Sequence, residues 1–222
     1  MSLSRRERER LARREAMLEA AALVFAERGF DNATLDEIAQ RAEFGKGTLY
    51  NYFSSKDELL LAVIERTYTQ FTGIIEESFA VERISTGPFE VLLRDFLFAC
   101  LSLFSNQQHL FMLLMREGHR LFFSGNPEHA TFFLNHRDRV MQLMCAALQH
   151  GIDCGTIRNI DTHAMSVLIL STIKECQLEL IVPNDTAMSC SMGTFQSPEH
   201  AVDVLVPLLM NGIAAAPPPS SN

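Results

Sequence analysis

The sequence predicts an all-α protein, with an N-terminal three-helix helix-turn-helix domain followed by a larger helical domain. Apolar residues recur at helical spacing along nearly the whole chain, and no stretch alternates apolar and polar residues convincingly enough for a strand. Ser or Thr followed by Glu three residues later places helix starts at Thr34 and Ser55. Gly and Pro separate the apolar segments, notably at Gly29 and residues 87–88. We therefore expect helices joined by turns.

The first 60 residues contain the elements of a helix-turn-helix. A helix over about residues 8–28 has one apolar face. A second helix begins at Thr34, whose capping box with Glu37 satisfies two amides at the helix start. The turn over 42–45 leads to a third helix over about 46–53. Two short helices joined in this way present the second helix to the major groove of DNA.

The rest of the chain predicts a helical regulatory and dimerisation domain. A helix opened at Ser55 keeps an apolar register to Phe79. Further helices are expected over about 88–107, 108–123, 127–150, 162–182 and 198–213. Residues 183–197 read as a polar loop, and the Pro- and Ser-rich end as a disordered tail. The predicted domains are 1–56 (helix-turn-helix), 57–213 (regulatory) and 214–222 (tail).

The charge of the 222-residue chain is unevenly distributed. The net charge is -8, which excludes a wholly basic nucleic-acid-binding protein. Residues 61–222 hold nine Lys or Arg against 16 Asp or Glu, whereas residues 1–14 hold six Arg and two Glu. A basic end on an acidic body orients a molecule on DNA, so we interpret the arginine run as phosphate-contacting. The alternative is a solvated helix face.

The residue content favours a cytoplasmic protein without a cofactor. The five Cys are scattered and lack C-x-x-C spacing, as expected of free thiols in a reducing compartment. The charged N-terminus predicts no signal peptide, and charges interrupt the most apolar run, over 88–104, so we expect no membrane span. His129 and His136 share a helix face but lack a third ligand, so no metal site is predicted. No phosphate loop or G-x-S-x-G motif is present, and we expect no enzyme.

The residues of the helix-turn-helix resemble the tetracycline-repressor (TetR) family of bacterial regulators. The resemblance covers about residues 13–62. It depends on four motifs in order: Phe-Ala-Glu-Arg-Gly-Phe at 25–30, Thr34 with Ile38-Ala39, Lys-Gly-Thr-Leu-Tyr-Asn-Tyr-Phe at 46–53, and Lys-Asp-Glu-Leu at 56–59. The remaining chain matches the family in length and helical character. This resemblance implies a homodimer that binds an operator in double-stranded DNA.

The turn over 42–45 departs from the family pattern. The family often has Ala-Gly-Val-Ser here, whereas this chain has Ala-Glu-Phe-Gly. Glu43 replaces a glycine that commonly takes a left-handed backbone, and Gly45 replaces the serine that usually caps the third helix. Losing that serine for glycine costs only about a few tenths of a kcal/mol. The departure therefore affects the tilt of the third helix rather than the fold.

The predicted DNA-contacting surface lies mainly on the third helix. Its N-terminal end faces base edges, where Lys46 can donate to guanine and Asn51, further along, can pair with adenine. A helix N-terminus at Thr34 can meet a phosphate. The resemblance implies phosphate contacts for Tyr52 and Lys56, while Tyr50 is equally compatible with the core. The expected DNA-contacting residues are Thr34, Lys46, Gly47, Thr48, Tyr50, Asn51, Tyr52 and Lys56.

A ligand pocket and a dimer interface are expected in the regulatory domain. Soft, bulky side chains around 105–145 suit a pocket for an apolar or amphipathic molecule, although they also suit a core. The pocket residues are predicted to be Phe111, Met112, Met115, His119, Phe122, Phe123 and Met141. Charged neighbours such as Arg116 and Glu117 fit a surface charge pattern better than a pocket. The family architecture implies a dimer interface at Leu168, Thr172, Glu175, Val202, Leu205, Val206 and Leu209, residues that equally suit an intramolecular core.

Together these features predict a ligand-responsive, dimeric transcriptional regulator, a repressor that a small apolar ligand releases from its operator. One alternative is a DNA-binding protein of the same fold without a small-molecule effector, acting on the nucleoid or with a protein partner. A second is a helical small-molecule-binding protein or enzyme with an incidental helix-turn-helix. A failure to bind any DNA favours the second alternative.

Overall fold

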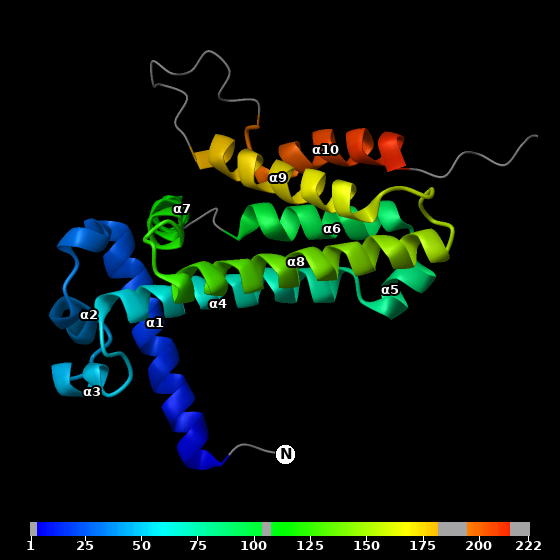
Figure 1. The fold of residues 1–222 in the computed structure, drawn as a ribbon. Helices are drawn as coiled ribbons and strands as arrows, with labels where there is room; N and C mark the ends of the chain where they lie inside the picture. The colour runs from blue at the N-terminus through cyan, green and yellow to red at the C-terminus, as the bar shows by residue number, and fades with distance from the viewer. Residues whose placement is uncertain (1–3, 104–107, 182–194, 214–222) are drawn as a thin grey trace, which may run out of the picture. The chain divides into compact units, whose positions relative to one another are not determined.

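The computed structural model describes residues 4–103, 108–181 and 195–213, and every regular element within them is a helix (Figure 1). The predicted all-α class is confirmed. The helices are α1 (Arg5–Asn32), α2 (Leu35–Arg41), α3 (Lys46–Tyr50), α4 (Lys56–Ser78), α5 (Val81–Thr86), α6 (Phe89–Ser102), α7 (Gln108–Phe122), α8 (Pro127–Asp153), α9 (Thr162–Ile181) and α10 (Pro198–Ile213). No helix of the described residues is long and apolar enough to cross a membrane.

Helix boundaries agree best with the sequence where a local cap fixes them. The amide of Ala164 donates to Asp161 at 3.0 Å and the amide of His200 donates to Ser197 at 3.2 Å, at the predicted starts of α9 and α10. Elsewhere α3 ends at Tyr50 rather than near 53, α6 ends before 107, and α5 was not predicted. Most of the predicted loop and the whole predicted tail lie outside the described residues.

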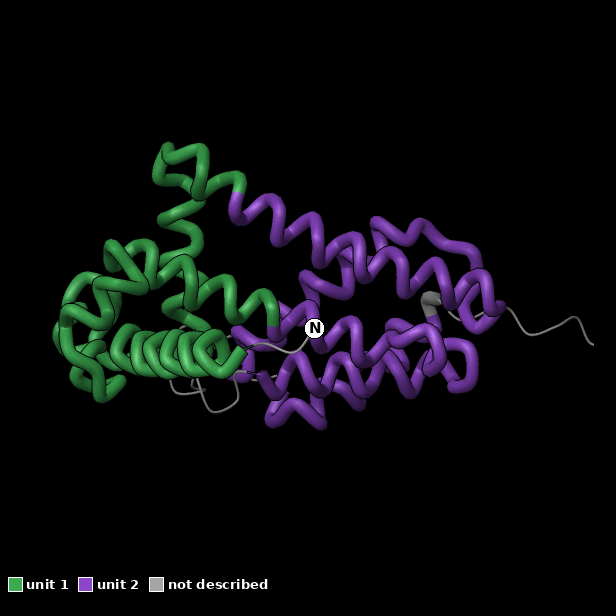
Figure 2. Tube along the Cα trace, turned by 90° about the horizontal axis from the view of Figure 1, so that it is seen from below, with its two compact units in different colours: residues 1–69, 107–131 green, residues 70–106, 132–222 purple. Residues whose placement is uncertain are grey.

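Contacts divide the chain into two compact units (Figure 2). Residues 1–69 and 107–131 form the N-terminal unit, and residues 70–106 and 132–222 form the C-terminal unit. This division differs from the boundary expected after residue 56, because α7 packs on α1 within the N-terminal unit. The helix-turn-helix is therefore stabilised by a helix that lies far from it in sequence.

The N-terminal unit is organised around α1, which packs on both α2 and α7. Met17, Leu18 and Phe25 are buried on its inner face. Its helical geometry breaks at Gly29, which has a φ of 74° and a ψ of 164°. The Phe30 ring then lies 5.7 Å from that of Phe25. The predicted end of the first helical run at this glycine is thus confirmed, and the chain turns from there towards α2.

The C-terminal unit is organised around α6, against which both α9 and α10 pack. The Phe79 ring stacks on Phe89 with 5.5 Å between centroids and lies 5.1 Å from Phe96. The buried amide of Gln177 on α9 donates to the carbonyl of Cys100 on α6 at 2.8 Å. Burial raises the pKa of the Cys176 thiol to about 11, with smaller contributions from neighbouring Glu179 and Glu175, so this cysteine is a packing residue.

Candidate DNA-binding interface

The turn between α2 and α3 is closed by the two backbone hydrogen bonds of a Schellman motif. The amide of Phe44 donates to the carbonyl of Ala39 at 2.9 Å, and the amide of Glu43 donates to that of Gln40 at 3.1 Å. The motif needs a left-handed residue, and Glu43 has a φ of 59°. Among the described residues it is the only one besides glycine with a positive φ. Glu43 occupies this position at a steric cost of about 1–2 kcal/mol.

α3 is anchored by few side chains. Leu49 is its one buried residue, and Phe53, just beyond its end, is also buried. Gly45 is the N-cap and provides no side-chain hydrogen bond, although its carbonyl accepts the amide of Thr48 at 2.9 Å. A five-residue helix with a single buried anchor leaves most of its surface open to a partner.

Lys46 and Gly47 lie exposed at the N-terminal end of α3. The ammonium of Lys46 donates to a carboxylate oxygen of Asp36 on α2 at 2.8 Å, and this hydrogen bond raises the pKa of Lys46. A base contact by Lys46 therefore requires exchange of the Asp36 carboxylate for a guanine. No atom lies within 4 Å of the position that a Cβ on Gly47 would take, so this helix end is open to close approach.

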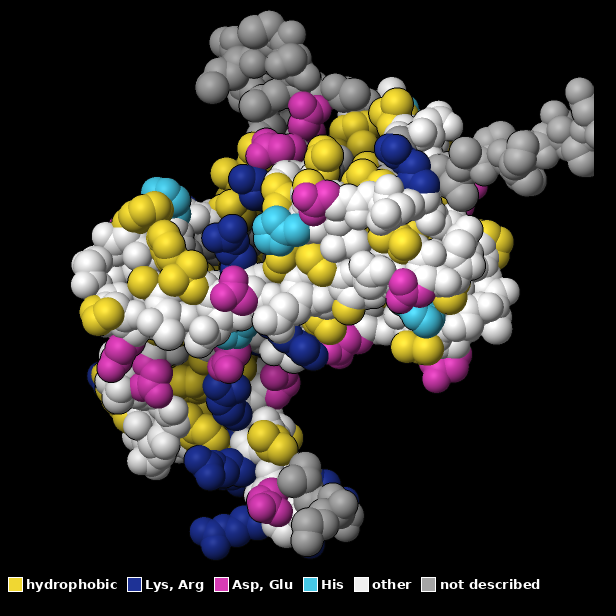
Figure 3. Space-filling model, turned by 45° about the vertical axis from the view of Figure 1, so that its right-hand side comes forward, with side chains coloured by type: hydrophobic (Ala, Val, Ile, Leu, Met, Phe, Trp, Pro, Cys, Tyr) yellow, Lys and Arg dark blue, Asp and Glu magenta, His cyan; other side chains and the backbone are white. Residues whose placement is uncertain are grey.

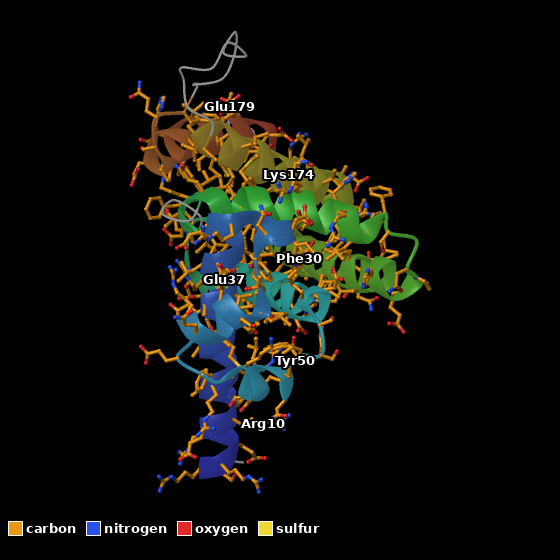
Figure 4. All side chains as sticks on the ribbon, turned by 90° about the vertical axis from the view of Figure 1, so that its left-hand side faces the viewer. Arg10, Phe30, Glu37, Tyr50, Lys174 and Glu179 are labelled. Carbon is orange, nitrogen blue, oxygen red and sulfur yellow. The ribbon has the colours of Figure 1, made fainter. Side chains whose placement is uncertain are left out.

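The remaining polar residues of the α3 region differ in exposure. Tyr50 is 46% exposed, so it is not a core residue (Figure 4). Asn51 is also exposed, whereas Thr48 and Tyr52 are half-buried. The centre of the Tyr52 ring lies 6.5 Å from that of the buried Phe53 ring, so Tyr52 lies beside the buried side chains under α3. The structure thus places these four predicted contact residues on α3 and the segment that follows it.

The capping box predicted at the start of α2 is confirmed. The hydroxyl of Thr34 accepts the amide of Glu37 at 3.2 Å, and the Glu37 carboxylate accepts the amide of Thr34 at 3.1 Å and its hydroxyl at 3.0 Å. Thr34 is exposed, as a phosphate contact needs. A phosphate approaching this helix end also meets the Glu37 carboxylate, which already occupies the same donors.

Lys56 has partners inside the protein. Its ammonium donates to the carbonyls of Phe30, Asp31 and Ala33 at 2.7, 3.1 and 3.0 Å, and it lies 4.6 Å from the centre of the Phe30 ring. The resemblance assigned this lysine to a DNA phosphate. In the structure its charge joins the end of α1 to the start of α4, so Lys56 positions the helices that flank the helix-turn-helix.

A buried carboxylate on α7 faces the same end of α1, and sequence reasoning missed it. Glu117 is 3% exposed, and its carboxylate accepts from Arg116 at 2.7 Å and from Arg120 at 2.6 Å. Arg120 also donates to Asp57 on α4 at 3.1 Å, and its guanidinium carbon lies 4.6 Å from the Phe30 ring centre. We call Glu117, Arg120, Asp57 and Phe30 the α7 clamp.

The surface charge pattern expected around Glu117 is therefore wrong for Glu117 itself. Leu113 and Leu121 lie four residues before and after it, and both are buried. This helical spacing puts the carboxylate in the middle of an apolar stripe, which is the signal that predicts its burial. Arg116 and Arg120 remain exposed at the edges of the stripe.

The residues predicted to line a ligand pocket have mixed exposure. Six lie on α7 or directly after it in the N-terminal unit, and Met141 lies on α8 in the C-terminal unit. Phe111 is buried, Phe122 and Met141 are half-buried, and four are exposed: Met112, Met115, His119 and Phe123. The ring of His119 lies 4.5 Å from that of Phe123. The pocket remains a prediction.

The predicted dimer residues divide into a buried and an accessible group. Val202, Leu205 and Val206 are buried on α10, the helix that packs on α6, so they serve the core of their own chain. Leu168 is 56% exposed and Glu175 is exposed, whereas Thr172 and Leu209 are half-buried. The prediction did not include Val167, Val204 and Leu208, which are exposed apolar residues on the same two helices.

Residues 17–63 match the family model described as bacterial regulatory proteins, tetR family. The transcriptional activator FasR of Mycolicibacterium smegmatis is 54% identical over 54 residues, which cover 24% of this chain and 25% of FasR. The transcriptional regulator UidR of Escherichia coli is 27% identical over 162 residues, covering 71% of this chain and 76% of UidR. The matches to FasR and to YvdT of Bacillus subtilis span only about a quarter of those relatives' length.

Solved structures extend the likeness of fold to most of the chain. FadR of Bacillus subtilis in complex with stearoyl-CoA has a TM-score of 0.69 at 21% identity, covering 89% of this chain and 98% of FadR. A putative tetR-family regulator from Mesorhizobium loti has a TM-score of 0.72 at 19% identity, covering 96% and 100%. At these identities the likeness establishes the fold.

Proposed function

We propose that the chain, whose residues 17–63 match the TetR-family model, acts as a dimeric, ligand-responsive transcriptional regulator. The α2–turn–α3 geometry, with its exposed polar surface, carries the proposal. In the DNA complex the N-terminal end of α3 enters the major groove, and Lys46 leaves Asp36 for a base edge. Asn51 and Tyr50 contact bases or sugars further along, and Tyr52 contacts a phosphate.

The test of this assignment is a titration of DNA from upstream of the chain's own gene at two salt concentrations. Lys46→Ala is expected to weaken binding roughly ten- to hundredfold, because it removes a contact to a base edge. Arg139→Ala is the matched control, since Arg139 is also an exposed, ion-paired cation, with Glu76 of α4 at 2.8 Å, and lies outside the proposed interfaces. Unchanged affinity in both Lys46→Ala and Tyr52→Ala would remove α3 from the interface.

The proposed dimer contact uses the exposed apolar residues of α9 and α10. Val167, Leu168, Val204 and Leu208 leave apolar surface open on two helices of one unit. Two-fold helix-turn-helix dimers bind two half-sites about one DNA turn, roughly 34–36 Å, apart, so a dimer suits the proposed function. The double variant Leu168→Glu/Leu208→Glu is expected to sediment as a monomer and to bind DNA weakly. A variant that stays dimeric would require another interface.

The proposed effector is a small apolar or amphipathic molecule, and long-chain acyl-CoA is the class to test first. FadR of Bacillus subtilis was solved with stearoyl-CoA, and α7 is rich in soft Met and Phe side chains, which adapt to apolar ligands. Such a ligand releases DNA only if it prefers the state that cannot bind DNA. Release by stearoyl-CoA but not by free CoA is the expected result. No release at any acyl length favours a DNA-binding protein without a small-molecule effector.

The proposed direction of control is repression. FasR, the relative with 54% identity in the DNA-binding region, is named an activator, so the direction needs its own measurement. Transcription from the bound promoter is compared with and without the protein in a purified system. Lower transcript with the protein, restored by the effector, supports repression. Higher transcript reverses the sign while leaving the DNA-binding proposal intact.

A further inference from the structure

The N-terminal turns of α1 carry arginines that have no role inside the protein. Every residue from Arg5 to Arg13 is exposed, and the first buried residue of α1 is Met17. At about 1.5 Å per residue the exposed part extends α1 by roughly 14 Å. The ion pair of Arg5 with Glu9, at 2.8 Å, is the one arginine pair in this stretch. The side chains of Arg6, Arg8, Arg10 and Arg13 form no hydrogen bond or ion pair within the described residues.

This projecting end is nevertheless an ordered helix with its own start. Ser4 caps it: its hydroxyl accepts the amide of Glu7 at 3.3 Å, and the Glu7 carboxylate accepts the amide of Ser4 at 2.8 Å. These hydrogen bonds from Ser4 lower the pKa of Glu7. Like charges one turn apart, such as Arg6 and Arg10, destabilise an isolated helix. A capped helix that tolerates this repulsion is suited to an anionic partner.

Three of the arginines lie on one face of the projecting helix. Arg6, Arg10 and Arg13 are spaced four and three residues apart, so they form a stripe. Continuing the same spacing leads to Met17 and Val24, which are buried. The stripe therefore extends the face that α1 turns towards its own unit. Figure 3 shows Lys and Arg side chains along this projecting helix, several of them on the same side.

The next arginine ties this face to the end of the helix-turn-helix. The guanidinium carbon of Arg14 lies 5.6 Å from the centre of the Phe53 ring, directly after α3, and Arg14 pairs with Glu65 of α4 at 3.9 Å. The stripe of Arg6, Arg10 and Arg13 ends one residue before this contact. In Figure 4 the labelled Arg10 and Tyr50 lie at the same end of the N-terminal unit.

We infer that Arg6, Arg10 and Arg13 form a second DNA-binding surface, which contacts backbone phosphates beside the major groove occupied by α3. The stripe rises about 10 Å, which matches roughly three base-pair steps along the DNA axis. The guanidinium group is suited to phosphate because its donors match the anion's oxygens. This inference rests on the proposed DNA-binding function and adds contacts that carry affinity without sequence preference.

The test measures how affinity for DNA depends on salt. The full chain is titrated onto a mixed-sequence duplex of about 30 base pairs, roughly three helical turns, at several salt concentrations. In the variant Arg6→Gln/Arg10→Gln/Arg13→Gln the slope of log affinity against log salt is expected to become shallower by about 2–3, because each lost phosphate contact removes about 0.9. Circular dichroism confirms that α1 remains helical.

A matched pair of single variants separates the stripe from general charge. Arg10→Gln is expected to make the slope shallower by about 0.9. Arg8 is equally unpaired but lies on the opposite side of the helix, so Arg8→Gln should leave the slope nearly unchanged. Equal changes of slope in Arg10→Gln and Arg8→Gln would contradict a DNA-binding stripe on one face of the helix. If the wild type binds DNA and the triple variant has the same slope, the arginine stripe does not contact phosphates, while the proposed function stays intact. If the triple variant loses binding to anionic lipid vesicles but keeps the wild-type affinity for DNA, the stripe is a membrane-binding surface. A wild-type chain that binds no duplex defeats the proposed function itself.

Discussion

α3 and α7 belong to the same structural unit but are held in it by different means. α3 has five residues and one buried side chain, Leu49. α7 has fifteen residues and buries apolar side chains on three turns, together with the Glu117 carboxylate. A helix with a single anchor leaves its surface free for a partner, but its orientation then depends on the turn before it. A helix with many anchors can instead stabilise the end of α1, from which the helix-turn-helix begins.

Loss of its single buried anchor should affect α3 more than any other substitution considered for this unit. Leu49→Ala is expected to lower the free energy of unfolding by about 2–5 kcal/mol, because a fully buried leucine leaves a cavity. It should also weaken DNA binding by the molecules that remain folded, since Leu49 is the one buried residue of α3. Chemical denaturation gives the stability, and a DNA titration well below the unfolding midpoint gives the affinity.

Leu113→Ala is the matched control for that variant. Leu113 is equally a buried leucine, but α7 keeps several other buried residues. The loss of stability should therefore be similar, while the folded protein retains its affinity for DNA. If Leu113→Ala weakens DNA binding as much as Leu49→Ala does, the two helices are not separable in the way proposed.

The second prediction concerns the buried carboxylate of α7. Glu117→Gln is expected to lower the free energy of unfolding by about 1–3 kcal/mol, because two charged hydrogen bonds to Arg116 and Arg120 are replaced by weaker ones. Arg120 then holds Asp57 and Phe30 less firmly, so amides of the α1 end should exchange faster with solvent. Hydrogen exchange measured on peptides covering residues 26–34 reports this directly.

Glu128→Gln provides the control, because it removes the same charge from an exposed position at the start of α8. It should lower stability by no more than about 1 kcal/mol, because an acid in a first turn favours the helix, and should leave exchange at the end of α1 unchanged. Protection of residues 26–34 that stays the same in Glu117→Gln contradicts the α7 clamp.

The difference between the two helices also marks what the sequence could predict. The start of α2 follows from Thr34 and Glu37, because a capping box joins residues three apart. Lys56 reaches carbonyls 23 to 26 residues away, so its internal role depends on how α1 and α4 meet. A local pattern does not contain that information. The phosphate contact that the family resemblance implies for Lys56 stays a prediction.

Long-range packing likewise decided the roles of side chains beyond the helix-turn-helix. Helical spacing places Val202, Leu205 and Val206 on one apolar face, but it does not say whether that face meets another copy or the same chain. Packing of α10 on α6 assigns it to the same chain. The burial of the Glu117 carboxylate could not be predicted from its charge alone. Its apolar neighbours at four-residue spacing are the signal that predicts it.

A smaller change in the free energy of unfolding tests how far α3 depends on the turn before it. Glu43→Gly should raise the free energy of unfolding by about 0.5–1 kcal/mol, because glycine relieves the left-handed strain but loses more entropy on folding. Glu43→Gln removes the same charge without relieving the backbone, so its stability should stay near that of the wild type. Thermal unfolding compares the three proteins. Equal stabilisation by both variants would assign the effect to charge rather than to backbone conformation.

The smallest predicted effect comes from restoring a cap to α3. Gly45 has a φ of -68° and a ψ of 148°, which serine adopts readily, and the nearest atom to an added Cβ is the Thr48 hydroxyl at 4.0 Å. Gly45→Ser should therefore stabilise the protein by about a few tenths of a kcal/mol, through a hydroxyl that accepts an amide at the helix start. For a chain of this size that raises Tm by roughly 1 °C.

Gly45→Ala separates the cap from the added carbon, because alanine fills the same space without an acceptor. It should be less stable than Gly45→Ser by about 0.5–2 kcal/mol. Serine that is no better than alanine would mean that the start of α3 gains nothing from a side-chain acceptor. The orientation of α3 would then depend on buried Leu49 and Phe53 and on the left-handed turn at Glu43, which is still few contacts beside those of α7.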